Sequence, residues 1–371
     1  MAFYLLFLFL ITLLIGLTYL FTNKSNFFQI ILLVLALAVA GFRDGISGDF
    51  KSYVNWYINK TRDNDFEFGF VLIMNLFRWF NLNYHILFFF FSFFTIFFIF
   101  LGVKKYTKHS NLAFLFFLLI PALYLNSWSI IRQSFAVSIG FCAFYYLINK
   151  KYLIYVVLMG IGISVHYSAI VPFFVFVGVY KYADRIRIMH IVVLLFLSLI
   201  LSQFYWFYIF THFFEKTHYV AYFSSGNTHI NPNKIIVLNC LGVFLLFYWA
   251  RMKEVFPIQK YFIVLSLFSI IITNLFATAN DLNRFSNYFT VFEIVVFSDI
   301  IFLEFKERRG LLLTGLYLYG VSLFLYTIKA DYNLNNQGTK YIPYNSVFYK
   351  FDSPFFMYGV DYLGNPSIDK K

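Results

Sequence analysis

Charged side chains are scarce in this sequence: Asp, Glu, Lys and Arg make up only 12% of its 371 residues, whereas hydrophobic residues make up 61%. A soluble protein of this length would carry about a quarter of its residues as charged side chains. With half that share the surface cannot be covered by charge, so the remaining apolar surface must face lipid. This scarcity excludes a soluble, disordered or fibrous chain. The net charge of +12 is also spread too thinly for a nucleic-acid-binding patch, so no nucleic-acid partner is expected.

Cysteine is nearly absent as well, and both cysteines, Cys142 and Cys240, sit inside apolar runs. Neither has a neighbouring Cys or His at the spacing of a metal site, so we expect reduced thiols that fill space and no disulfide framework. We expect no metal and no other cofactor. Asp63 and Asp65 form a D-x-D pattern, which holds a metal in some sugar transferases, but in so polar a loop it is more typical of a solvated surface.

Long apolar runs are what the sequence has in abundance, and its mean hydropathy is +0.73. A helix that spans a membrane needs about 20 mainly apolar residues. No Lys or Arg precedes the first run, so we expect it to stay in the membrane and not to be cleaved as a signal peptide. The apolar runs cover residues 2–22, 27–42, 84–102, 111–127, 130–148, 152–165, 167–180, 188–206, 234–250, 260–278, 286–304 and 311–328.

The short basic connections between these runs indicate their orientation, because Lys and Arg favour the cytoplasmic side. If all of them are cytoplasmic, an even number of spans separates each neighbouring pair. The apolar stretch between Lys151 and Lys181 must then form two short helices, with a turn near His166 below the membrane surface. The sequence therefore predicts an all-α, polytopic integral membrane helix bundle with about 12 spans (10–13) and both ends extracytoplasmic.

No internal repeat, Gly/Ser linker or appended soluble domain is visible. We expect a single transmembrane domain over residues 1–330, with outer loops at about 43–83 and 207–233, and an extracytoplasmic tail over 331–371. Glu67 to Phe80 reads as an amphipathic or re-entrant helix within the first outer loop. The run YIPY in the tail is typical of an ordered segment.

Most polar residues that are not cytoplasmic anchors fall on one predicted level, at the outer ends of the spans. A charged residue there is costly unless it lines a wet cavity or meets a partner. The pattern predicts one hollow that opens outward, lined by arginines, carboxylates and one imidazole. Simpler interpretations remain open: Arg43 and Arg284 as interfacial anchors, and His166 as a core histidine bonded to a carbonyl. Glu293 and Asp299 lie deeper and need partners, either in structural pairs or on a proton path.

Six segments then follow one another in a familiar order: GFRDGISGDFKSY, EFGF, IRQSFAVSIGF, VHYSAIVPF, DLNRFSNYF and YIPYNSVF. In order and spacing they resemble the EpsG/Wzy family of polysaccharide polymerases, over residues of about 40 to 350. An acid, Asp44, stands beside Arg43 and makes that segment less positive than a pure phosphate site. The shared polar positions of the family fall on Arg43, Gly48, Asp49, Tyr53, Glu67, Arg132, Gln133, His166, Arg284 and Tyr344.

The resemblance implies a glycosyltransferase that polymerises repeat units of O-antigen, capsule or exopolysaccharide. These units are carried on undecaprenyl diphosphate, as both donor and acceptor, at the outer face of the bacterial inner membrane. The arginines would neutralise the departing diphosphate, and His166 would act as the base, with Asp49 or Glu67 as substitutes. The expected catalytic residues are His166, Arg132, Arg284, Asp49 and Glu67, and the expected substrate-binding residues are Arg43, Tyr53, Gln133 and Tyr344.

Three other functions remain open: a flippase or exporter of the same lipid-linked sugar, an O-antigen ligase, and a membrane acyltransferase. A flippase would have internal pseudo-repeats and ionisable residues reachable from both faces, whereas here the outer face dominates. Besides membrane lipid, a membrane protein that regulates chain length is a conceivable partner.

Overall fold

The computed structural model describes residues 1–21, 25–60, 66–202, 232–278, 280–333 and 341–348. Regular structure in these ranges is helical, apart from one isolated antiparallel bridge between Arg43 and Ser346. The longer helices are α1 (Ala2–Leu20), α2 (Ser25–Gly41), α5 (Tyr84–Tyr106), α6 (Ser110–Leu119), α8 (Ile131–Ile148), α9 (Tyr152–Val165), α10 (Ile170–Tyr182), α11 (Ile188–Leu201), α14 (Pro232–Val255), α15 (Gln259–Leu275), α18 (Glu293–Leu303) and α19 (Lys306–Asn333).

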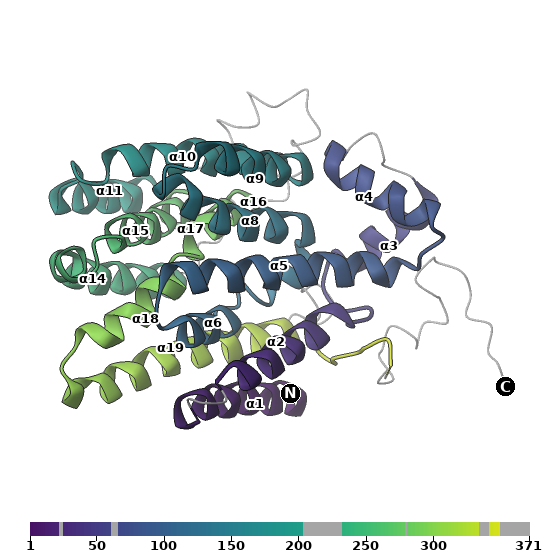
Figure 1. Ribbon diagram of the computed structural model, residues 1–371, viewed down its shortest axis with the longest axis horizontal. Helices are drawn as coiled ribbons and strands as arrows, with labels where there is room; N and C mark the ends of the chain where they lie inside the picture. The colour runs from purple at the N-terminus through teal and green to yellow at the C-terminus, as the bar shows by residue number, and fades with distance from the viewer. Residues whose placement is uncertain (22–24, 61–65, 203–231, 279, 334–340, 349–371) are drawn as a thin grey trace.

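Short helices connect them. Two of these, α3 (Phe50–Asn59) and α4 (Phe68–Trp79), lie together at one end of the bundle, at the right of Figure 1. The others are α7 (Asn126–Ser129), η2 (Tyr167–Ala169), α16 (Asn280–Asn283), η3 (Arg284–Ser286) and α17 (Asn287–Thr290).

Six stretches of the described residues are helical, long and apolar enough to cross a membrane, so the chain is a membrane protein. They are Ala2–Leu20, Tyr84–Tyr106, Ile131–Ile148, Pro232–Val255, Arg284–Leu303 and Lys306–Asp331. The other predicted spans also contain helices, but these have 10–17 residues. The prediction of a helical membrane bundle is confirmed, while the count of about 12 spans stays a prediction.

The predicted break in the stretch after Lys151 is confirmed. Helix α9 has 14 residues and ends at Val165, and His166 then adopts an extended conformation before the turn η2. At 1.5 Å per residue a helix of this length covers only about 21 Å. The break therefore sets the His166 backbone apart from both helices, at a turn between two apolar segments.

Intramembrane polar residues pair as expected in one case. The Asp299 carboxylate in α18 accepts hydrogen bonds from the side chains of Thr107 and Gln259. Glu293 is also buried, in the first turn of α18, and no hydrogen-bond partner of its side chain is seen within the described residues. Of the two free cysteines, Cys142 is buried, but Cys240 lies on the exposed side of α14 and does not fill a gap in the interior.

The stretch 341–348 packs against the bundle, which agrees with the expectation of an ordered YIPY segment. The Tyr344 ring stacks on Phe3 at 3.9 Å, and its hydroxyl donates to the Val39 carbonyl at 2.9 Å. Backbone hydrogen bonds from Asp44 to Asn345 and from Val347 to Phe42 fasten the stretch to the loop after α2.

Helix α4 approaches α9 closely through Gly69. A Cβ added at Gly69 would lie 2.8 Å from the Ser164 carbonyl oxygen, in addition to meeting the Ser164 hydroxyl. Because the obstacle includes backbone, it cannot be relieved by a change of side-chain rotamer. The absence of a side chain at this position thus lets the start of α4 reach the end of α9.

We therefore predict that Gly69→Ala displaces the start of α4 from α9 and lowers the free energy of unfolding by about 1–3 kcal/mol, as overpacking typically does. Gly160→Ala in α9 is the matched control, because a Cβ there has nothing within 4 Å. Thermal unfolding of the two purified variants provides the measurement. Equal melting temperatures for both would contradict the close approach.

Candidate active site

The Glu67 carboxylate lies at the junction of three segments that are far apart in the sequence. It comes from the residue before α4, and it meets Arg132 from the first turn of α8 and His166 from the turn after α9. Its side chain is 8% exposed, so the carboxylate is almost withdrawn from solvent. A buried carboxylate is costly unless it is paired and hydrogen-bonded. Both of its oxygens find partners here.

One Glu67 oxygen holds the imidazole of His166. Oε1 lies 2.9 Å from Nδ1 of His166, and the backbone N–H of Tyr167 donates to the same oxygen at 3.3 Å. Burial alone would raise the pKa of Glu67, but the hydrogen bond with His166 and the charge of Arg132 lower it to about 2. The carboxylate is therefore ionised near neutral pH and can only accept, so the proton between the two groups belongs to Nδ1.

The surroundings of the imidazole favour its neutral form. Burial lowers the pKa of His166, and although the bond to Glu67 opposes this, the positive charges of Arg132 and Arg284 lower it further. A neutral ring with its proton on Nδ1 has a lone pair on Nε2. The His166 side chain is 24% exposed, so the ring is not sealed off. The arrangement provides a base whose tautomer is fixed by a carboxylate.

The second Glu67 oxygen is paired with Arg132, whose guanidinium is held among aromatic rings. The guanidinium carbon lies 4.6 Å from the centre of the Phe66 ring, 5.2 Å from that of Phe70 and 5.9 Å from that of Tyr53. Its Nε donates to the Tyr53 hydroxyl at 3.4 Å. Only 14% of the Arg132 side chain is exposed. Arg132 thus fixes Glu67 more than it faces solvent.

Arg284 provides an exposed cation beside this cluster. It begins the turn η3, and its backbone carbonyl accepts a hydrogen bond from the Gln133 side chain at 2.8 Å. Gln133 therefore ties the Arg284 backbone to α8, next to Arg132. The charge of Arg284 acts on the His166 ring, which places it near the base. Asp49, the residue before α3, is half-buried, and its charge acts on Tyr53.

Two further residues connect this cluster, and neither was expected from the sequence. The hydroxyl groups of Ser168 and Tyr288 lie 2.8 Å apart, and Tyr288 is buried. This hydrogen bond joins the turn after His166 to the segment after Arg284. Ser168 lies in the segment VHYSAIVPF and Tyr288 in DLNRFSNYF. Their closeness in sequence to His166 and Arg284 was the one feature that could have marked them in advance.

Arg43 is not part of the cluster, although it was expected to line an open hollow. Its side chain is 0% exposed. Its guanidinium donates to the Trp128 carbonyl at 2.7 Å, to the Ser92 hydroxyl at 3.0 Å and to the Ala40 carbonyl. Carbonyls at a helix end lack partners within the helix, and Arg43 supplies one. The Tyr344 hydroxyl likewise donates to a backbone carbonyl, that of Val39. Arg43 and Tyr344 thus hold the backbone in place and are not part of the candidate site.

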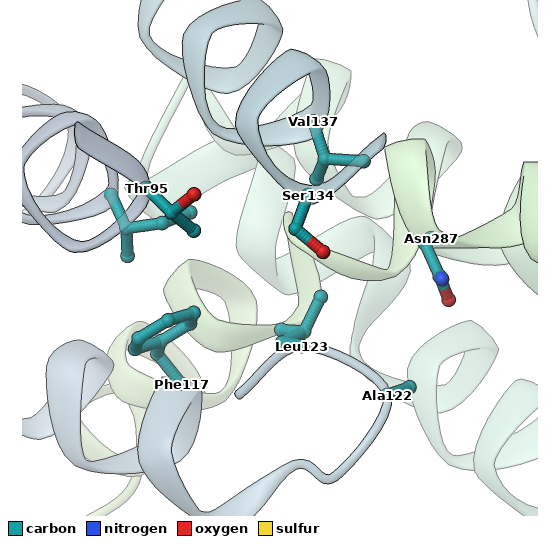
Figure 2. A pocket seen from close by; sticks show the side chains of 8 residues that line it. Thr95, Phe117, Ala122, Leu123, Ser134, Val137 and Asn287 are labelled. Carbon is teal, nitrogen blue, oxygen red and sulfur yellow. The ribbon is translucent and has the colours of Figure 1, made fainter. Parts of the chain in front are cut away.

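A small cavity lies between α5, α8, α17 and the loop after α6. Figure 2 shows Thr95, Ser134 and Asn287 around it, with the Ser134 hydroxyl directed inward. It has room for about one water molecule, so it is too small for a sugar or a lipid. In the described ranges no group of three His, Cys, Asp or Glu side chains is close enough to hold a metal. Asp63 and Asp65 lie outside these ranges.

A family profile matches residues 26–346, which is most of the chain, and its description is the EpsG family. The chain belongs to the EpsG family. This is the family of Wzy-type polysaccharide polymerases, so the resemblance seen in the sequence is confirmed, and membership indicates a polysaccharide polymerase-like function. No curated protein and no solved structure matches the chain. The segments that form the cluster around Glu67 all lie within the matched range.

The pH dependence of activity tests this electrostatic arrangement. The rate of polymer formation should fall as the pH drops through the pKa of His166, which lies below 6.5, because the protonated ring is no longer a base. Glu67→Gln removes the negative charge that favours the imidazolium, so the pKa of His166 falls further. The acidic limb of the pH–rate profile should therefore move to lower pH, while the maximal rate falls.

The measurement is the initial rate at several pH values with purified protein in liposomes. Glu254→Gln is the control, because Glu254 is an exposed carboxyl on α14. An acidic limb at the same pH in wild type and Glu67→Gln would show that His166 is not the titrating group.

Proposed function

We propose that this EpsG-family protein polymerises undecaprenyl-diphosphate-linked repeat units into O-antigen or a related surface polysaccharide. The reaction is a glycosyl transfer at the outer face of the bacterial inner membrane. The observation that carries this proposal is the base formed by Glu67 and His166 beside an exposed cation, Arg284, in a membrane protein of a polymerase family. The distribution of basic loops in the sequence supports the outer face.

The acceptor step needs a base for a sugar hydroxyl. The lone pair on Nε2 of His166 removes the hydroxyl proton as the oxygen attacks the anomeric carbon of the donor glycan. The imidazolium that forms is stabilised by the ionised Glu67, in the way that a carboxylate supports histidine in a catalytic triad. Arg132 keeps Glu67 in place throughout, because its guanidinium is fixed among three aromatic rings.

The donor step breaks the bond between the anomeric carbon and the diphosphate oxygen. Negative charge then develops on a polyprenyl diphosphate, and a planar guanidinium matches phosphate oxygens well. Arg284 is suited to this role because its side chain is exposed, whereas Arg43 is fully buried and only 14% of the Arg132 side chain is exposed. The proton taken by His166 passes to the departing diphosphate or to solvent, which returns the base to its neutral form.

The same base and cation would also serve an O-antigen ligase, in which the acceptor is a different glycolipid. A flippase has less use for a histidine held in one tautomer, because transport forms and breaks no covalent bond. Deletion of the gene separates these functions. Single repeat units that still reach the cell surface indicate a polymerase, units trapped inside indicate a flippase, and loss of even single attached units indicates a ligase.

We predict that His166→Gln reduces long-chain polysaccharide by about 10²-fold or more, the usual contribution of a general base. The chain-length ladder on a gel, at matched levels of membrane protein, provides the measurement. His190→Gln is the control, because His190 is an exposed histidine that only caps the start of α11. A normal ladder from His166→Gln would remove His166 from the mechanism.

A further inference from the structure

Helix α4 presents an apolar stripe on its exposed side. Residues four apart lie on one face of a helix, and here the residues at this spacing are large, apolar and open. The opposite face, with Gly69, Phe70 and Met74, is buried against the bundle. The stripe consists of Phe68 (71% exposed), Leu72 (55%), Leu76 (48%) and, at the far end, Trp79 (75%) and Phe80 (58%).

The stripe begins at the candidate active site. Phe68 follows Glu67 directly, and the buried side of the same turn carries Phe70, which contacts the Arg132 guanidinium. From there α4 extends for 12 residues, or about 18 Å, at the end of the bundle and not alongside the middle of the spans (Figure 1). The apolar stripe therefore starts one residue from the carboxylate that holds the base.

Both ends of α4 are held by contacts with neighbouring segments, so the stripe is preformed. At its start, Gly69 packs against the Ser164 backbone. At its end, Arg78 donates to the carbonyls of Tyr57 and Trp56, each at 2.8 Å. Arg78 is only partly exposed, and the exposed cation of the candidate active site is Arg284, near the opposite end of α4. The exposed cation therefore lies near the start of the stripe, and the apolar residues lead away from it.

We propose that the exposed stripe of α4 binds the isoprenoid chain of the lipid-linked donor, while the diphosphate lies at Arg284. This inference rests on the proposed function and extends it to the lipid part of the substrate. An amphiphile with an anionic head and a long apolar chain matches this arrangement, in which a cation and a base lie near one end of an apolar stripe. A rigid apolar surface binds such a chain at a low ordering cost to the protein. It also holds the anomeric carbon at a constant distance from His166.

Binding of sugar-free lipids tests the proposal without knowledge of the glycan. The affinities of the purified full-length protein are measured for undecaprenyl diphosphate, geranyl diphosphate and inorganic diphosphate. Wild type should bind undecaprenyl diphosphate most tightly. The double variant Leu72→Asn/Leu76→Asn should lose at least tenfold in affinity for undecaprenyl diphosphate and keep its affinity for the other two.

The matched control is Leu153→Asn/Val157→Asn on α9, where two exposed apolar residues have the same spacing (77% and 52% exposed). This variant should bind all three probes as wild type does. An equal loss in both double variants, or competition by phosphatidylglycerol at the same concentration, would identify the stripe as a general lipid contact and overturn the proposal.

A second measurement does not depend on the double variant being folded. In a Cys240→Ser background, Leu76→Cys should be protected from a maleimide by undecaprenyl diphosphate but not by geranyl diphosphate. If wild type binds no diphosphate lipid, the proposed donor is wrong as well. If wild type prefers the long chain while the α4 variants retain that preference and Leu76→Cys stays reactive, only the place of the isoprenoid chain is wrong.

Discussion

The carboxylate of Glu67 is the group on which the candidate site depends. It is almost buried, and burial opposes its charge, but Arg132 and His166, with the Tyr167 backbone N–H, keep it ionised. These partners come from different segments of the bundle. One ionic junction therefore fixes the relative positions of α4, α8 and the turn after α9. The same junction places the imidazole of His166 and fixes which of its two nitrogens carries the proton.

Burial divides the three arginines into different roles. Arg43 is enclosed and donates to carbonyls near the ends of α2 and α7, so it braces the loops. Arg132 is enclosed by aromatic rings and anchors Glu67. Arg284 alone among these three has an exposed side chain. Arg284 is therefore the arginine of these three that a substrate reaches most easily.

The fold was largely predictable, because the apolar runs are long and the basic loops are short. Hydropathy places helices in all the predicted spans, and the parity of basic loops places the break at His166. Hydropathy does not determine how many helices cross the membrane, because a helix of 14 residues such as α9 is equally apolar whether it spans or stops inside.

The candidate site was predictable only in part. The resemblance gathered Glu67, Arg132, His166 and Arg284 into one group, and the structure brings them together. It could not separate Arg43 and Tyr344 from that group, because their hydrogen bonds to distant carbonyls exist only in the folded chain. The bond between Ser168 and Tyr288 was missed for the same reason, since a hydroxyl pair across two segments leaves no local pattern.

The central claim is that His166 is a neutral imidazole and that Glu67 fixes its proton on Nδ1. Nitrogen NMR of protein labelled at histidine, with His166→Gln used to assign the signal, reads this state directly. Near neutral pH the account predicts a neutral ring protonated at Nδ1 and free at Nε2. A doubly protonated ring, or a neutral ring with its proton on Nε2, would contradict it.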